Sequence, residues 1–261
     1  MKTLTLTNKQ LHLGNLILVN KEHGLLKPSA GTLVPVAYQS DMLLQRQAAA
    51  LLENLMEQID GWQYIVPVSG WRSTHEQQQI WDDSLAENGL EFTRTYVAVP
   101  GHSEHQTGLA IDLALRQEHI DFICPEFPYE GICQKFREMA PDYGYIERYP
   151  KGREAVTGIG HEPWHFRYVG VPHAKIMTEN NLVLEEYMDF IKDYEYGSKP
   201  YILSVNGREI SVSYLPMTNT NGTRLMIDDT LIYSISGNNI DGFIMTEWRH
   251  AHENKAELMW A

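Results

Sequence analysis

The chain has 261 residues, 43% of them hydrophobic, and carries a formal net charge of −13 at pH 7. This length can bury a full core, either in one large domain or in a main domain with a small appendage. The negative charge disfavours binding to nucleic acid and to acidic membranes, because both attract clustered Lys and Arg.

The N-terminal segment alternates apolar and polar residues and lacks the continuous apolar stretch of a signal peptide. No other segment approaches the roughly 18 apolar residues that suggest a membrane span. Cys124 and Cys133 are too few for a disulfide framework and lack metal-ligand spacing, so both are expected to be ordinary thiols. We therefore expect a soluble, cytoplasmic protein without a membrane anchor.

The first predicted region, residues 1–197, mixes helices with short strands. Residues 41–60 place their apolar side chains on one helical stripe, and either Ser40 or Asp41 could be the N-cap. Residues 65–70 (IVPVSG) predict a short strand that ends at a glycine.

A second helix is predicted directly after Arg72, which would sit at a corner between strand and helix. Residues 73–76 (STHE) have the form of a capping box, and helical residues continue until Gly89. A third helix is expected to follow Pro128 and Gly131.

A fourth helix over residues 182–195 ends this region, and hairpin patterns follow it. Asn206-Gly207 lies between two β-rich runs, which is a strong hairpin signal. Residues 230–248 predict two more strands around a Gly-Asn-Asn turn. Residues 198–261 hold no cluster of candidate ligands, so we expect a β-rich C-terminal appendage that packs on the main domain or forms a subunit contact.

An aspartate lies inside the alternating apolar run of residues 109–115. In a strand, Asp112 shares a face with two small alanines, and a buried carboxylate costs several kcal/mol unless a cation or strong donors compensate it. His105 lies an odd number of residues earlier, so only a bend at Gly108 brings both side chains together. This segment alone leaves two interpretations open, a metal ligand or an aspartate bonded to backbone amides.

Residues 161–165 (HEPWH) match the H-E-x-x-H zinc pattern, which requires a helix. Pro163 and the β-prone run of residues 164–169 exclude that helix, because a proline in a helix interior costs about 3 kcal/mol or more. A strand instead places His165 on the face opposite the neighbouring aromatic side chains. Glu162, just before the proline, then suits a general base better than a ligand.

Three of these residues, His105, Asp112 and His165, are of the kinds that zinc accepts, and they leave a fourth position for water. Glu162 could take the proton of that water as it attacks a carbonyl group. Arg72 is the candidate positive partner for the resulting oxyanion.

These motifs resemble the zinc D,D-peptidases of the vancomycin-resistance type, which share a zinc core with the hedgehog signalling domain. The resemblance spans roughly residues 60–170 and is carried by three motifs: Ser69-Gly70-Trp71-Arg72-Ser73 with Gln77, Ser103-x-His105-x-x-Gly108-x-Ala110-x-Asp112, and Glu162-x-Trp164-His165. Two sequence segments, HSEHQTGLAIDL and ISGNNIDGF, are most similar to the bifunctional D,D-dipeptidase/D,D-carboxypeptidase subgroup.

The resemblance also assigns the site residues. One catalytic zinc ion would lie on the three ligands named above, with Glu162 as the catalytic base and Arg72 as the stabiliser of the transition state. Ser103 would contact the terminal carboxylate of the substrate, and Gln77 and Trp81 would line the pocket. His102 and His161 match no ligand role.

The implied fold is α+β, with a small antiparallel sheet that carries the zinc site and helices packed around it. The implied function is hydrolysis of D-Ala-D-Ala, removal of the terminal D-Ala from muramyl pentapeptide precursors, or both, which confers vancomycin resistance. Alternatives are an L,D-carboxypeptidase or peptidoglycan endopeptidase with the same zinc core, or a non-catalytic zinc-binding module. The sequence leaves open the oligomeric state and whether residues 82–100 form a lid.

Overall fold

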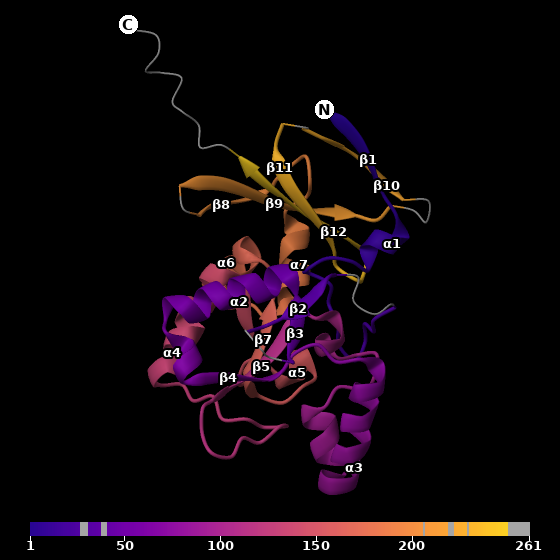
Figure 1. Cartoon of the computed structure of the whole chain (residues 1–261). Helices are drawn as coiled ribbons and strands as arrows, with labels where there is room; N and C mark the ends of the chain where they lie inside the picture. Colours follow the sequence, from indigo (N-terminus) through magenta and orange to yellow (C-terminus); the bar gives the residue numbers. More distant parts are fainter. Residues whose placement is uncertain (27–30, 38–40, 206, 219–221, 229, 250–261) are drawn as a thin grey trace, which may run out of the picture. The chain divides into compact units, whose positions relative to one another are not determined.

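A computed structural model describes residues 1–26, 31–37, 41–205, 207–218, 222–228 and 230–249 (Figure 1). The chain divides into two compact units, one formed by Leu18–Tyr187 and the other by Met1–Ile17 together with Met188–Ala261. This division groups the first residues of the chain with its C-terminal strands, whereas the sequence suggested domains of residues 1–197 and 198–261.

The unit of residues 18–187 is built on a four-stranded antiparallel sheet. Its strands run in the order β4 (Ile65–Ser69), β5 (Ala110–Leu115), β7 (Glu162–Tyr168) and β6 (Tyr145–Tyr149). Alternation along β5 and β7 sends Ile111, Leu113 and Phe166 into the hydrophobic core. The predicted α+β class with a small antiparallel sheet is thus confirmed, and the H-E-x-x-H segment is a strand as expected.

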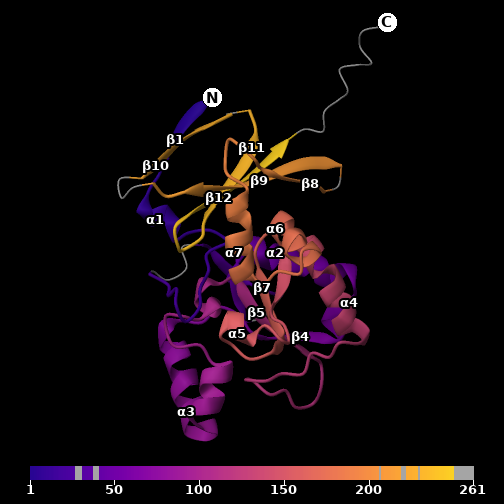
Figure 2. The same ribbon diagram turned by 180° about the vertical axis from the view of Figure 1, so that it is seen from behind.

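Helices α2 (Arg46–Gln58) and α4 (Gly131–Met139) contribute to the same core as the sheet. Their core side chains are small or apolar: Ala48, Ala49, Leu52, Leu55 and Met56 from α2, and Cys133 and Phe136 from α4. Within this unit, α3 (Thr74–Tyr96) projects away from the sheet, as Figure 1 and the reverse view in Figure 2 both show.

The prediction of a helix over residues 41–60 was wrong at its N-terminal end. Helix α2 begins at Arg46, because Leu43–Gln45 instead form a short strand, β3, that pairs with β2 (Leu33–Pro35). Gln45 occupies the N-cap position. Asp41 precedes β3, and Ser40, the other proposed cap, lies outside the described residues.

The predicted capping box at the start of α3 is confirmed. The backbone N–H of Glu76 donates to the Ser73 hydroxyl at 3.1 Å, and the Glu76 carboxylate accepts from the Ser73 N–H at 2.7 Å. Gly89 interrupts the helix with a φ of 80°, but a second helical segment continues to Tyr96. A lid function for this segment stays a prediction.

Three further helices follow in this part of the chain. They are α5 (Glu154–Thr157), α6 (Val171–Glu179), which the sequence analysis did not predict, and α7 (Leu184–Phe190), which continues as a 3-10 turn over Ile191–Asp193. The predicted helix over residues 182–195 is therefore shorter than expected. None of the described helices has the length and apolar character needed to cross a bilayer.

The other unit is rich in strands. Strand β1 (Lys2–Leu6) pairs with β10 (Thr223–Ile227), and a short helix, α1 (Asn8–Leu11), follows β1. A separate four-stranded sheet runs in the order β11 (Ile232–Gly237), β12 (Gly242–Arg249), β9 (Arg208–Pro216) and β8 (Tyr201–Val205). Both predicted hairpins are present as antiparallel pairs. Asn206 of the first turn lies outside the described residues, and Asn239 of the second has a φ of 65°.

A buried histidine in α6 should make the stability of this protein sensitive to acid. Burial lowers the pKa of His173, which lies beside the Tyr187 hydroxyl, to about 3. Between about pH 3 and pH 6.5 the unfolded chain therefore binds a proton that the folded chain does not. The free energy of unfolding consequently decreases as the pH is lowered through this range, by up to about 1.4 kcal/mol per pH unit. When urea unfolding is compared at pH 7.5 and pH 5, the free energy of unfolding should decrease less for His173→Gln than for the unaltered protein.

Tyr187→Phe is the matched control, because it removes the hydroxyl partner but keeps the imidazole. Its loss of stability between the two pH values should equal that of the unaltered protein. An equal loss in His173→Gln would contradict the assignment of this pH dependence to His173.

Candidate metal centre and active site

Two neighbouring strands bring an aspartate and a histidine together. Asp112 on β5 pairs directly with His165 on β7, and Ser69 on β4 pairs with Asp112 from the other side. The Cβ atoms of directly paired residues on antiparallel strands lie about 4.5–5.5 Å apart. The sheet register therefore places the carboxylate beside the imidazole, and both residues are 4% exposed.

His105 reaches the same carboxylate from a 3-10 turn, Glu104–Thr107, rather than from a strand. The turn ends at Gly108, whose φ of 71° provides the bend that the sequence required. Nδ1 of His105 lies 2.8 Å from the carbonyl oxygen of Gly70, and Nε2 lies 3.1 Å from Oδ2 of Asp112. Because a carbonyl oxygen can only accept, Nδ1 carries the hydrogen and Nε2 presents a lone pair.

Strand β3 supports the backbone on both sides of this histidine. The carbonyl oxygen of Leu43 accepts from the N–H of Trp71 at 2.7 Å. The backbone N–H of Gln45 donates to the carbonyl of Gly108 at 2.8 Å, and its side-chain amide donates to the carbonyl of Thr107 at 2.8 Å. The loop before α3 and the turn before β5 are thus tied to one short strand.

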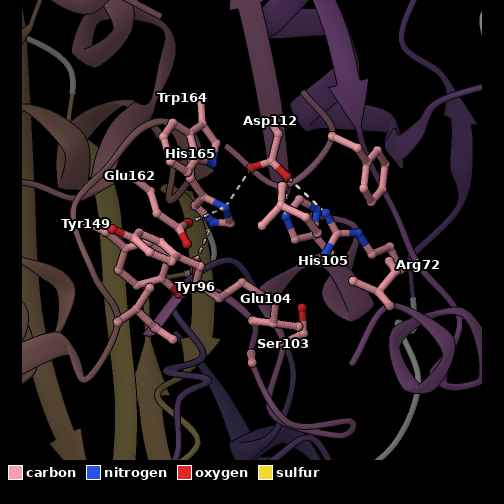
Figure 3. Close-up of a pocket in the computed structure, with 16 residues that line it drawn as sticks. Arg72, Tyr96, Ser103, Glu104, His105, Asp112, Tyr149, Glu162, Trp164 and His165 are labelled. Atoms are coloured by element: carbon pink, nitrogen blue, oxygen red, sulfur yellow. Dashed lines mark hydrogen bonds and ion pairs between the residues drawn. The ribbon is translucent and has the colours of Figure 1, made fainter. Parts of the chain in front are cut away.

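His105, Asp112 and His165 form one buried cluster (Figure 3). Their three ligand atoms lie within 4.8 Å of one another, and Nδ1 of His165 is 2.9 Å from Oδ1 of Asp112. The lone pair of His105 faces an anionic oxygen, which is repulsive unless a proton or a cation lies between them. A divalent cation satisfies all three donors at once, so these residues fit a metal ion.

The charges of this cluster are coupled. Burial alone would raise the pKa of Asp112, but the two imidazoles hold it well below its ordinary value. Burial, together with Arg72, lowers the pKa of His105 to about 4. Burial acts in the same direction on His165, but hydrogen bonds to Asp112 and Glu104 raise its pKa to about 9. Asp112 is therefore an anion at neutral pH, as a metal ligand must be.

Glu162 is a second buried carboxylate of the site, and its pKa moves in the opposite direction. It is the first residue of β7, and its Oε2 lies 3.7 Å from Nδ1 of His165. Burial raises the pKa of Glu162 to about 8. A carboxyl group with a pKa near neutrality is suited to proton transfer.

Arg72 is held against the cluster by three acceptors. Its Nε donates to the Ser69 hydroxyl at 2.7 Å, Nη2 to Oδ2 of Asp112 at 3.0 Å, and Nη1 to the side-chain oxygen of Gln77 at 3.4 Å. The ring of Phe122 lies over the guanidinium, with 5.5 Å between the ring centroid and Cζ. A fixed cation thus faces the same space as the metal-binding cluster.

One cavity contains these groups, and its lining includes Ser103, the residue expected to contact the carboxylate of the substrate. Its other lining residues are Arg72, Ile80, Tyr96, Val97, Ala98, Glu104, His105, Asp112, Phe122, Ile123, Tyr149, Ile159, Glu162, Trp164 and His165. Gln77 lies behind Arg72, fully buried, and donates to the carbonyl of Ala98 at 2.8 Å. Trp81 is half-buried and is not among the lining residues, whereas its neighbour Ile80 is.

The two unassigned histidines have structural partners instead of a place in the cluster. Nδ1 of His102 lies 2.7 Å from the carbonyl oxygen of Asn20. Nε2 of His161 lies 2.7 Å from the hydroxyl of Tyr129, which also donates to Glu147. Both histidines therefore link separate segments of the chain, His102 to Asn20 and His161 to Tyr129.

Sequence reasoning missed a buried ionic group beside the cluster. Oε1 of Glu104 accepts from Arg148 at 2.8 Å and from Arg167 at 2.6 Å, and Glu185 binds Arg148 from the other side. Burial alone would raise the pKa of Glu104, but the two guanidiniums hold it well below its ordinary value. The position of Glu104 between two motif residues, Ser103 and His105, was the sequence signal that it lies near the site. Nothing in the local sequence pattern indicated that its side chain is buried.

Comparison with known proteins identifies the family. The family model described as VanY, D-alanyl-D-alanine carboxypeptidase, matches residues 41–171, which include every residue that lines the cavity. The chain belongs to the VanY family. It is therefore a peptidase by descent, as the motifs predicted.

Other members of the family are similar over most of the chain. The bifunctional D-Ala-D-Ala dipeptidase and D-Ala-D-Ala carboxypeptidase VanXYC of Enterococcus gallinarum is 43% identical over 183 residues, which are 69% of this chain and 96% of that protein. The crystal structure of the vancomycin resistance D,D-dipeptidase VanXYg, in complex with a D-Ala-D-Ala phosphinate analog, has a TM-score of 0.92 at 50% identity and covers 95% of this chain and 99% of its own.

A third relative was solved with a metal. A mutant of the D,D-pentapeptidase VanY from a VanB-type resistance cassette, in complex with Zn(II), has a TM-score of 0.58 at 31% identity. The match covers 67% of this chain and 98% of that chain.

A divalent cation should stabilise this VanY family member through the buried cluster. Ligand binding to the folded state alone raises the free energy of unfolding by about 2.7 kcal/mol when the free ion is at 100 times its Kd. Metal-free protein should therefore melt at a higher temperature once Zn²⁺ or Co²⁺ is added, as followed by circular dichroism. His161→Ala should retain this shift and Asp112→Ala should lose it. An equal shift in Asp112→Ala would place the metal elsewhere.

Proposed function

We propose that this chain is a zinc-dependent D,D-peptidase that hydrolyses D-Ala-D-Ala and removes the terminal D-Ala from muramyl pentapeptide precursors. This activity would destroy the target of glycopeptide antibiotics and so confer vancomycin resistance. The observation that carries the proposal is the buried cluster of His105, Asp112 and His165, with Glu162 and Arg72 on the same cavity. The similarity to VanXYg, solved with a D-Ala-D-Ala phosphinate analog, supports this choice of substrate.

The proposed zinc ligands are Nε2 of His105, a carboxylate oxygen of Asp112 and Nδ1 of His165. Two imidazoles and one carboxylate form a ligand set that zinc accepts, and the Zn(II) complex of the related VanY supports the choice of ion. A zinc ion held by these residues would act as a Lewis acid and would lower the pKa of a coordinated water to about 7. Three protein ligands leave a coordination position open for such a water.

Glu162 is proposed as the general base. Its carboxylate would take the proton of the attacking water and pass it to the amine that leaves when the peptide bond breaks. Burial raises its pKa to about 8, and a cation in the neighbouring cluster would bring that pKa back toward neutrality. The group would then be ionised and still basic enough to accept the proton.

Arg72 is proposed to stabilise the negative charge that develops on the carbonyl oxygen, because its guanidinium is already fixed by three acceptors. Ser103 on the cavity wall would bind the terminal carboxylate of the substrate. Gln77 would act by holding Arg72. For Trp81, a substrate contact stays a prediction.

We also propose that residues 1–197 form the peptidase domain, that residues 198–261 are an appendage, and that the protein acts in the cytoplasm. The site residues all lie between Ser69 and His165, which supports the first assignment. Cys124 and Cys133 are both free thiols, the state that a reducing compartment maintains. Cell fractionation tests the location, and activity confined to a surface or membrane fraction would contradict it.

The substrate assignment predicts release of D-Ala from both substrates. Liquid chromatography should detect D-Ala from the free dipeptide and from the pentapeptide precursor, with zinc content measured on the same sample. A tetrapeptide that ends in L-Lys-D-Ala is the control and should be cleaved much more slowly. Cleavage of that tetrapeptide alone would favour an L,D-carboxypeptidase instead.

The role of Glu162 predicts a separation of catalysis from metal binding. Glu162→Gln should lower kcat by about 10²- to 10⁴-fold, the usual contribution of a general base, while zinc content stays at one ion per chain. His161→Ala, at the neighbouring position, should keep both zinc and most of the activity. Loss of zinc from His161→Ala would mean that His161 is needed to hold the metal and would contradict the proposed ligand set.

A further inference from the structure

Two buried polar atoms face each other beside the metal cluster. Oε2 of Glu104 and Nε2 of His165 are 3.5 Å apart, and neither has any other hydrogen-bond partner among the residues that the structure describes. The Glu104 side chain has no exposed surface, and that of His165 is 5% exposed. A buried polar atom without a partner costs about 1–3 kcal/mol, so a hydrogen bond between these two atoms is strongly favoured.

The other oxygen of Glu104 is fully engaged, which fixes the direction of the carboxylate. Oε1 accepts from Nε of Arg148 and from Nη1 of Arg167, and the side chains of both arginines are completely buried. Glu185 in turn holds Arg148 with two hydrogen bonds of 2.7 and 2.8 Å. Two cations and two carboxylates thus form a group with no net charge, and it aims Oε2 of Glu104 at His165.

The chemistry of imidazole gives this contact a consequence for the metal. A neutral ring carries one hydrogen, so a ring that presents the lone pair of Nδ1 must carry its hydrogen on Nε2. A carboxylate oxygen can only accept, and it therefore selects this tautomer. His105 is fixed by the same principle but with the opposite nitrogen, because its Nδ1 faces the carbonyl oxygen of Gly70.

We infer that Glu104 is a positioning residue that accepts a hydrogen bond from Nε2–H of His165 and so presents Nδ1 of this histidine to the metal. This inference rests on the proposed zinc site. It adds that the buried pair of arginines serves the metal site, because Arg148 and Arg167 hold Glu104 in the required orientation.

The substitution Glu104→Gln tests the inference sharply. The amide oxygen would stay with the two arginines, so the amide NH₂ group would face Nε2 of His165 and favour a hydrogen on Nδ1, the nitrogen needed for the metal. Substitution of a residue that orients a ligand costs about 10- to 100-fold in metal affinity. The zinc Kd, measured by competition with a chelator, should therefore rise by this factor.

Glu185→Gln is the matched control. It removes the same charge from the same arginine group but does not touch His165. Both variants should unfold more easily than the unaltered protein, whereas only Glu104→Gln should weaken zinc binding. Equal zinc affinity in the two variants would overturn the inference, and failure of the unaltered protein to bind zinc would instead overturn the proposed function.

A spectroscopic measurement on the unaltered protein needs no variant of Glu104. Long-range ¹H–¹⁵N correlation of ¹⁵N-histidine protein, with His165 assigned from its loss in His165→Ala, reports which ring nitrogen carries hydrogen. We expect hydrogen on Nε2 in the zinc-loaded protein. A zinc-loaded His165 that carries its hydrogen on Nδ1 would overturn the inference even if Glu104→Gln failed to fold.

Discussion

The site depends on one buried carboxylate, that of Asp112, held between two imidazoles and a guanidinium. A lone carboxylate in a sheet core would cost several kcal/mol, and the neighbouring backbone is arranged to compensate this one. The strand register places His165 of β7 beside Asp112, and the bend at Gly108 brings His105 to it. Arg72 reaches the same carboxylate from the corner before α3. Three separate elements thus bring a compensating group to this anion.

The same cavity keeps two carboxyl groups in different states. Asp112 is surrounded by cations and potential cations, which hold its pKa well below the ordinary value. Glu162 has the pKa of about 8 that burial produces, because its counter-charges do not outweigh desolvation. One carboxylate can therefore stay bound to a metal while the other exchanges a proton, although the two side chains are neighbours.

The sequence predicted the parts of this site that local rules control. The alternation of residues 109–115 predicted the face of the strand from which Asp112 projects, and Gly108 predicted the bend that brings His105 to it. Pro163 excluded a helix at the H-E-x-x-H segment. The sequence did not reveal the role of Glu104, because a glutamate in a polar turn usually lies in solvent. Its burial is compensated by Arg148 and Arg167, which are far from it in the sequence. The strand at Leu43–Gln45 was missed for a related reason, since pairing with β2 overrode a helical pattern.

The hydrogen bonds of β3 have a consequence for how inactivating changes are sought. Leu43 and Gln45 support the backbone of the loop that carries Trp71 and of the turn that ends at Gly108. A substitution that shifts this strand would displace both loops by the same movement and would disorganise the site without changing any ligand or base residue. A comparison of family sequences that inspects only the ligand and base positions would count such variants as intact.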